Sequence, residues 1–346
     1  MGKFWEYLYW LPEPINWVFT VNHLYLLAFV VALILILYFL LPHKNEKAMR
    51  ITFLALGLIV GILEVSRIVW SYGYFNAMNA PTDSAFWWWT ISFQICAISA
   101  WSTVFTMIAS FFLKKDHPVM QFMYPILLGV SLVGAALAFF YPDMIEEMKP
   151  FFHFRNLQTI VTHTLLIFSP IYLIKTRRYV VKMSDLWKVA FGWFSAICIS
   201  MSASLISGQC FGFALRCNLM EDIGLFFPFP FHLILLGIIM MAISFSIFKL
   251  STLKQNHKGT KAAEEKFKVL DQKMHIQSTL LLFASGVIGL ATLFIIASNV
   301  ELTSWWGLAC LLPIPLTGSL LYLSFKIRAK SHEVARSLET ETATQK

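Results

Sequence analysis

Charged side chains are scarce in this sequence. Asp, Glu, Lys and Arg together make up 13% of the 346 residues, whereas hydrophobic residues make up 58%, and the mean hydropathy is +0.67. A soluble domain of this size could not cover so much apolar surface with polar side chains. The composition therefore excludes a soluble protein and indicates a polytopic membrane protein, with the bilayer as its solvent.

Cysteine is also sparse, and the common cofactor motifs are missing. The five cysteines form no C-x-x-C pair and no Cys/His cluster of the kind that binds zinc. The sequence contains no G-x-x-x-x-G-K-[ST] loop, no G-x-G-x-x-G turn after a strand and no internal repeat. We therefore expect neither a metal nor a cofactor. The net charge of +8 would suggest nucleic acid in a soluble protein, but in a membrane protein basic cytoplasmic loops explain it, so no nucleic-acid partner is expected.

The N-terminal stretch shows no cleavable signal peptide. Residues 1–21 are rich in aromatic side chains and are interrupted by Pro12 and Pro14, and they contain neither a short apolar core nor an A-x-A site. We expect this segment to lie in the membrane interface. The first membrane span would then act as the targeting signal.

Long apolar runs, by contrast, recur along the chain. Nine of them have the length of roughly 20 residues that a helix needs to cross a bilayer. They extend over about residues 22–41, 51–72, 88–113, 119–141, 154–174, 186–207, 228–249, 275–298 and 304–325. The sequence therefore predicts an all-α, polytopic membrane bundle of about nine transmembrane helices.

Lys and Arg are distributed unevenly between the loops on the two sides of these spans. The segments that follow the odd-numbered spans contain 22 of the 27 basic residues, and the segments on the other side contain 4. The remaining basic residue, Arg67, lies inside the second span. Because basic loops stay in the cytoplasm, the asymmetry predicts an N-terminus outside and a C-terminus inside.

Composition divides the chain into five parts. They are an interfacial segment at 1–21, a seven-helix core with the candidate site at 22–250, a cytoplasmic linker at 251–273, a two-helix extension at 274–326 and a cytoplasmic tail at 327–346. The charged linker is interpreted as a solvated surface helix. The polar tail, rich in Thr and Glu, is predicted to be disordered.

The third predicted span carries a polar stripe. In TISFQICAISAWSTVF, Ser92, Cys96, Ser99 and Thr103 follow one another at i, i+4, i+7 and i+11. In a continuous helix these residues would share one face. A helix that faces lipid gains nothing from such a stripe, whereas a helix that lines a polar cavity does. A buried cysteine is more often an inert small hydrophobe, so the function of Cys96 depends on what faces it.

Ionisable residues in two other spans are further candidates. Glu64 and Arg67 stand three residues apart in the second span, which allows a buried ion pair. Asn156 and His163 share one face of the fifth span. At ~1.5 Å per residue, Cys96, Glu64 and His163 each lie roughly 10–13 Å below the outer end of their span. This common depth predicts one buried polar chamber that opens outwards, although His163 and the ion pair also fit purely structural roles.

Cys96 and His163 together suggest acyl transfer. A buried thiol is inert unless a base or a cation assists it, and a histidine within hydrogen-bond reach takes its proton. Such a pair can carry an acyl group as a thioester, and a chamber inside the bilayer points to a lipid donor. Arg67 or Gln94 could hold a head-group phosphate or donate to an oxyanion.

Four stretches resemble the YwaF-like integral membrane proteins over about residues 20–250. FQICAISAW is similar to that family's LPLHLCSI signature, with Cys96 at the signature cysteine and Gln94 where the family usually has His. LQTIVTHTLLIFSPIYLI resembles the second signature, a span with a central His followed by Pro-Ile-Tyr, and ILEVSRIVW resembles the family's second span. SGQCFGFALRCNLMEDIGLFFPFPFHLI resembles the third signature, with Gln209 and Cys210 in place of an Asn-Tyr pair.

That family is similar to an animal transmembrane cysteine acyltransferase that builds polyunsaturated ether phospholipids. It is more distantly similar to the androgen-induced membrane hydrolases, which use Thr and His. By this resemblance Cys96 would be the nucleophile and His163 the base. We predict substrate contacts for Gln94, Glu64, Arg67, Asn156 and Gln209. The expected partner is a membrane phospholipid or lysophospholipid, and the expected location is the plasma membrane of a bacterium.

Two other classes of function stay open. In a small-molecule or ion-coupled transporter, Glu64, Arg67 and His163 would form a site near the midplane of the bilayer. The sequence shows no inverted repeat and no pair of Gly/Pro-broken helices, which such transporters often contain. A membrane partner protein without enzymatic activity is the third class. A lipid acyltransferase or transacylase, with hydrolysis as an alternative reaction, is the leading prediction.

Overall fold

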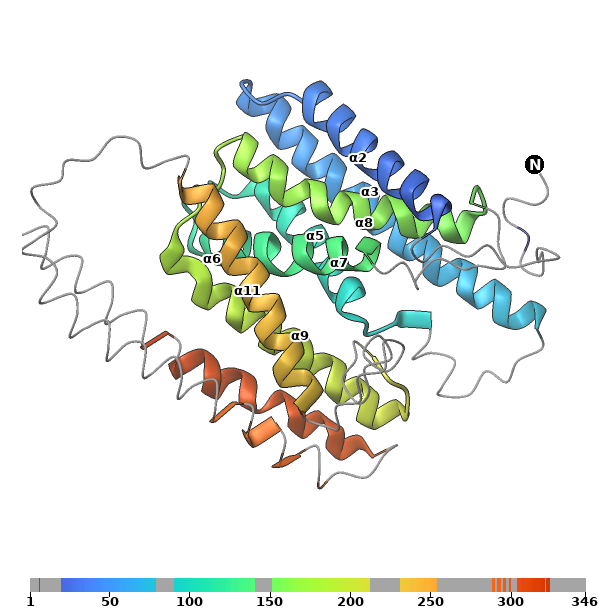
Figure 1. Ribbon diagram of the computed structural model, residues 1–346, viewed down its shortest axis with the longest axis vertical. Helices are drawn as coiled ribbons and strands as arrows, with labels where there is room; N and C mark the ends of the chain where they lie inside the picture. Colours follow the sequence, from blue (N-terminus) through green and yellow to red (C-terminus); the bar gives the residue numbers. More distant parts are fainter. Residues whose placement is uncertain are drawn as a thin grey trace, which may run out of the picture.

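The computed structural model describes most of the predicted core and part of the extension. The described residues are Glu6, 20–78, 90–140, 151–211, 231–253, 288–289, 291–293, 295–296, 299, 304–320 and 322–323. Every regular element within them is helical (Figure 1). Seven helices in this part of the chain are long and apolar enough to cross a membrane. The protein is therefore an all-α, polytopic membrane bundle, as the sequence predicts.

The seven helices follow the first seven predicted spans. They are α2 (Val21–Leu40), α3 (Glu46–Ala77), α5 (Ile95–Phe112), α6 (Pro118–Ile126) continued by η1 (Leu127–Ser131) and α7 (Leu132–Phe140), α8 (Phe154–Lys175), η2 (Met183–Asp185) continued by α9 (Leu186–Ser207), and α11 (Phe231–Leu253). The predicted interfacial segment, linker and tail lie almost wholly outside the described residues, and of the eighth span only residues 288–289, 291–293 and 295–296 are described. The ninth span coincides with a shorter apolar helix, Trp306–Leu320. The count of nine and the orientation therefore stay predictions.

Helix α3 is longer than its apolar run because polar groups stabilise its first turn. The N-cap Asn45 accepts a hydrogen bond from the Ala48 N–H at 3.1 Å. Glu46, the first helical residue, places a negative charge at the positive end of the helix dipole. Hydropathy alone does not detect this turn, so the sequence predicts a start at residue 51 where the structure has residue 46.

The fourth span contains a π-helical turn at its centre. All five residues of η1 (Leu127–Ser131) are buried, and the Leu132 N–H donates to the Leu127 carbonyl five residues earlier. Pro125, in α6 just before this turn, lacks an N–H. Turns of this kind are rare in proteins and frequently lie at functional sites. Here the π turn packs against α5 and α8, the helices that carry the candidate site.

The C-terminal extension packs against α9, on the side of the bundle opposite α2 (Figure 1). Its described residues include the 3-10 helix η3 (Trp305–Leu311). A Cβ atom on Gly307 would lie only 2.9 Å from the Leu205 Cβ, so the two helices are close because this residue has no side chain. Cys198 and Cys310 are both fully buried in this apolar contact. The extension is therefore part of the packed bundle.

Close packing at the π turn leads to a stability prediction. A Cβ atom on Gly129 would lie 2.1 Å from the Val189 Cγ1 atom on α9. We expect Gly129→Ala to lower the free energy of unfolding by about 1–3 kcal/mol, as overpacking in a core typically does. Gly237→Ala on α11 is the matched control, because no atom lies within 4 Å of its added methyl group. Thermal unfolding in detergent measures the stability of both variants, and equal melting temperatures for Gly129→Ala and Gly237→Ala would contradict the prediction.

Candidate functional site

The structure breaks the third predicted span directly before Cys96. The chain is helical at residues 90–91, Ser92 adopts a φ of 59°, and α5 begins only at Ile95. A residue in this left-handed region interrupts a right-handed helix. The prediction of one continuous helix over 88–113 is therefore wrong, and Ser92 does not belong to the helical face that carries Cys96.

As a result, Cys96 lies in the first turn of a helix. The Ile98 N–H donates to the carbonyl of the N-cap Gln94 at 3.1 Å, and this is the first hydrogen bond of α5. The N–H groups of Ile95, Cys96 and Ala97 therefore have no acceptor within the helix. The Ala97 N–H lies within hydrogen-bond reach of the partly buried Cys96 thiol. These donors and the positive end of the helix dipole favour a thiolate or another anion at this position.

His163 is buried on α8 with one ring nitrogen bonded and the other not. Its Nδ1 atom lies 2.8 Å from the Thr159 carbonyl oxygen. Because a carbonyl only accepts, Nδ1 carries the hydrogen and Nε2 keeps its lone pair. Among the described residues, the buried Nε2 atom has no hydrogen-bond partner. A purely structural role explains the hydrogen bond of Nδ1 but not the buried, unpartnered Nε2 atom. A general base needs one ring nitrogen that is held by a hydrogen bond and a second nitrogen that can accept a proton.

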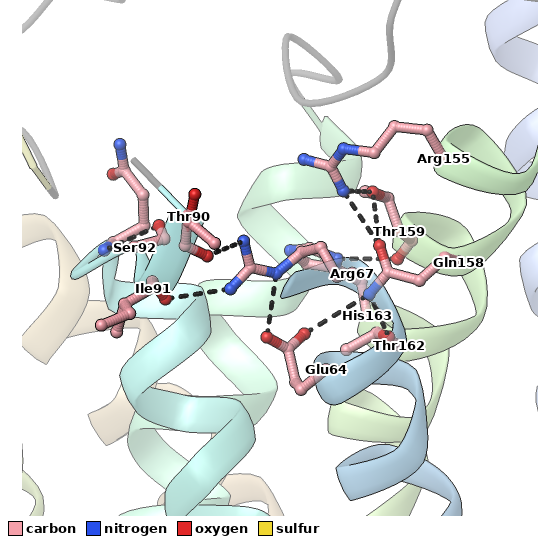
Figure 2. A network of polar contacts seen from close by, with 11 residues as sticks. Glu64, Arg67, Thr90, Ile91, Ser92, Arg155, Gln158, Thr159, Thr162 and His163 are labelled. Atoms are coloured by element: carbon pink, nitrogen blue, oxygen red, sulfur yellow. Dashed lines mark hydrogen bonds and ion pairs between the residues drawn. The ribbon is translucent and has the colours of Figure 1, made fainter. Parts of the chain in front are cut away.

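Glu64 and Arg67 form a buried ion pair on α3 (Figure 2). The Arg67 Nε atom lies 3.1 Å from the Glu64 Oε2 atom, and the two residues are 8% and 4% exposed. The two terminal nitrogens of Arg67 donate to the carbonyls of Thr90 and Ile91 at 3.1 and 3.0 Å. Each nitrogen of the guanidinium thus has a protein acceptor, and Arg67 is held against the break before α5.

The ion pair is connected to α8 through side chains that the sequence analysis did not single out. The Gln158 Nε2 atom donates to Glu64 Oε1 at 3.4 Å and to Thr162 Oγ1 at 3.2 Å. Arg155 donates to Gln158 Oε1 at 2.9 Å and to Thr159 Oγ1 at 2.7 Å. The stretch FRNLQTIVT at the start of the fifth span contains several polar residues, and this density was the available signal for Gln158 and Arg155.

Cys96 and His163 both border this network. Cys96 lies close enough to Glu64, Arg67 and Arg155 for electrostatic interaction. His163 also lies close enough to Glu64 and Arg155 for electrostatic interaction. Helices α3, α5 and α8 therefore converge on one buried polar region, the site to which the depth argument pointed.

The other predicted substrate contacts divide into two groups. Asn156 is fully buried on α8, and Gln94 is the partly buried N-cap of α5, so both belong to the helices of the site. Gln209 lies just beyond the end of α9, where its N–H donates to the Ser207 hydroxyl at 3.1 Å. The described contacts of Gln209 thus belong to the end of α9 and not to the polar network.

Two further sequence predictions concern cysteine pairing and metal binding. A disulfide between Cys210 and Cys217 is a prediction from their position in one outer loop, and Cys217 lies outside the described residues. Among the residues that the structure describes, no group of three His, Cys, Asp or Glu side chains could hold a metal ion.

The bundle and its site define a class: polytopic membrane proteins with a cysteine, a histidine and a buried ion pair around one intramembrane polar region. Comparison with protein families matches residues 18–248 to the TMEM164 family. The chain belongs to the TMEM164 family. The match ends before the C-terminal extension and covers the predicted seven-helix core. The similarity to the YwaF-like proteins and to the hydrolases stays a prediction. No curated protein and no solved structure matches the chain.

Proposed function

We propose that the protein is a membrane-embedded lipid acyltransferase or transacylase that carries the acyl group as a thioester on Cys96. The observation that carries this proposal is the position of Cys96 in the first turn of α5, after a break inside the span. The free N–H groups and the dipole at a helix N-terminus interact favourably with a thiolate. The unpartnered Nε2 atom of His163 supports the same conclusion, because it is suited to accept the thiol proton.

The proposed reaction has two halves. In the first, His163 Nε2 takes the proton of Cys96, and the sulfur attacks the ester carbonyl of a phospholipid. The N–H groups of the first turn of α5 stabilise the oxyanion, and the departing lysophospholipid oxygen receives the proton from His163. In the second half, His163 deprotonates the hydroxyl of an acceptor lysophospholipid, which attacks the thioester. The C–S bond then breaks, and the leaving Cys96 sulfur takes the proton back from His163. If water replaces the acceptor, the same steps give hydrolysis.

The location of the site supports a lipid substrate. Acyl chains are already dissolved in the bilayer, so an intramembrane nucleophile meets ester carbonyls without extracting them into water. Donor phospholipid and acceptor lysophospholipid are the proposed partners, in the plasma membrane of a bacterium, with an ether lysophospholipid as the acceptor suggested by the resemblance noted above. Gln94 and Asn156 are the proposed substrate contacts that lie on the helices of the site.

A transporter is the second candidate, and the break before α5 is the observation that favours it. Discontinuous membrane helices bind substrates and coupling ions in many transporters. In this candidate, Glu64, Arg67 and His163 would bind the transported species, and Cys96 would have no chemical role.

Trapping the thioester distinguishes the two candidates. Protein in lipid nanodiscs is incubated with a phospholipid that carries a labelled sn-2 acyl chain, and mass spectrometry then locates the label. We expect the label on the peptide that contains Cys96, with release by neutral hydroxylamine. In Cys96→Ser the label should be lost or held as a hydroxylamine-resistant ester, and Cys210→Ser, a control substitution of an exposed cysteine, should be labelled like the wild type. A wild-type protein that acquires no label on Cys96 would contradict the enzyme proposal.

A further inference from the structure

The break before α5 leaves backbone carbonyls that the helix itself cannot satisfy. In a continuous helix, each carbonyl of residues 90–93 would accept from an N–H group four residues further on. The positive φ of Ser92 removes that pattern. Inside a membrane an unsatisfied carbonyl is costly, because no water is available to replace the lost hydrogen bond. Side chains from other helices therefore have to supply the donors.

Two neighbouring helices, α3 and α9, do so. Arg67 on α3 donates to the carbonyls of Thr90 and Ile91 at 3.1 and 3.0 Å (Figure 2). Ser200 on α9 donates to the carbonyl of Phe93 at 2.8 Å. The planar guanidinium has donors on two terminal nitrogens, so it can bind two consecutive carbonyls at once, whereas lysine has a single ammonium nitrogen. The side chain at position 67 thus fits the geometry of the break.

The same arginine is connected to the helix that carries His163. Its Nε atom lies 3.1 Å from Glu64 Oε2, and Glu64 Oε1 accepts from Gln158 Nε2 at 3.4 Å. Gln158 also donates to the hydroxyl of Thr162, the residue next to His163, at 3.2 Å. Arg67, Glu64 and Gln158 are all at least nine-tenths buried. A buried network of this kind restricts how the connected elements move relative to one another.

We propose that Arg67 is a positioning residue that fixes the start of α5, and with it Cys96, relative to His163 on α8. The inference rests on the proposed function in that Cys96 and His163 are taken as the reacting pair. It assigns Arg67 a task other than holding a head-group phosphate, since each nitrogen of its guanidinium already donates to a protein acceptor.

The first test compares Arg67→Gln and Arg67→Lys with Arg50→Gln. Arg50 is the matched control, because it forms an exposed ion pair with Glu46 on the same helix. Acyl transfer is measured with phosphatidylcholine and with p-nitrophenyl laurate, an acyl donor without a phosphate. For Arg67→Gln we expect kcat to fall about 10²-fold with both donors and KM to change less than about threefold, as for a misplaced reacting group. The kcat of Arg67→Lys should lie between those of Arg67→Gln and the wild type, and the kcat of Arg50→Gln should equal that of the wild type.

A different pattern would overturn the inference. If Arg67 binds the phosphate, only phosphatidylcholine should lose activity, and the loss should lie in KM. Arg67→Lys keeps the positive charge, so it still provides the test if Arg67→Gln does not fold.

The second test needs no catalytic activity. Amide hydrogen exchange over residues 90–97 and the rate of Cys96 alkylation by N-ethylmaleimide are followed by mass spectrometry in the same variants. We expect both rates to change in Arg67→Lys and to stay at the wild-type values in Arg50→Gln. Wild-type rates in Arg67→Lys would overturn the positioning role. Changed rates in a protein that forms no thioester would support that role and refute the proposed acyl transfer, so the two failures are distinguishable.

Discussion

Replacement of Cys96 by Ala, and separately of His163 by Ala, should each lower the rate of acyl transfer by at least about 10³-fold, and the double replacement should lower it no further. The two side chains act in the same step: the thiol is a poor nucleophile without a base, and the base has no other proton to take. Because either loss removes the whole step, the effects cannot multiply.

The measurement is the initial rate of acyl transfer in nanodiscs for both single variants and the double variant. Cys198→Ala is the matched control, since Cys198 is a fully buried cysteine of α9 in an apolar cluster. Its activity should stay near that of the wild type. Losses that multiply in the double variant would show that Cys96 and His163 do not act as a unit.

The second large effect concerns stability. Glu64→Leu leaves the charge of Arg67 buried without a carboxylate, and removal of one partner of a buried ion pair typically costs about 3–5 kcal/mol. The double variant Glu64→Leu/Arg67→Met replaces the pair by apolar groups of similar size, so it should be clearly more stable than Glu64→Leu. In the double variant the carbonyls of Thr90 and Ile91 lose their donor, so full recovery is not expected.

Unfolding in mixed micelles measures these free energies. Arg50→Met is the control, because its ion pair with Glu46 is exposed and such pairs contribute roughly 0–1 kcal/mol. If Glu64→Leu and Arg50→Met lower the free energy of unfolding by the same amount, the prediction is contradicted, because the Glu64–Arg67 pair then contributes no more to stability than a surface ion pair.

The fold could be predicted from the sequence as far as hydropathy decides it. A span is an apolar run of sufficient length, and the bilayer imposes helical structure on it. This is why seven predicted spans agree with seven helices in the described part of the chain. Hydropathy does not report capping, so it missed the polar first turn of α3. The hydropathy pattern also does not predict the π turn at Leu127–Ser131, because such a turn depends on how neighbouring helices pack.

The candidate site was predictable in its residues and not in its geometry. Cys96, His163, Glu64 and Arg67 are conspicuous because polar groups inside a membrane are costly. The break before Cys96 was not predictable from local sequence, since it contains neither Gly nor Pro. Its stabilising donors, Arg67 and Ser200, are distant in the chain, and a single sequence does not show that they meet.

The π turn of the fourth span has a consequence for how sequences of this kind are aligned. A π turn holds one residue more than an α turn, so removal of one residue from Leu127–Ser131 would restore a regular α-helix and leave the residues after it on nearly the same helical faces. Phe139 accepts a hydrogen bond from His23 through its carbonyl, at 2.8 Å, and its ring meets that of His163 edge-on. Both contacts would be kept, because Phe139 would stay on the same face of the helix. A one-residue gap at this point of an alignment therefore marks the loss of the π turn, and not a change in the helical face that α7 turns towards the site.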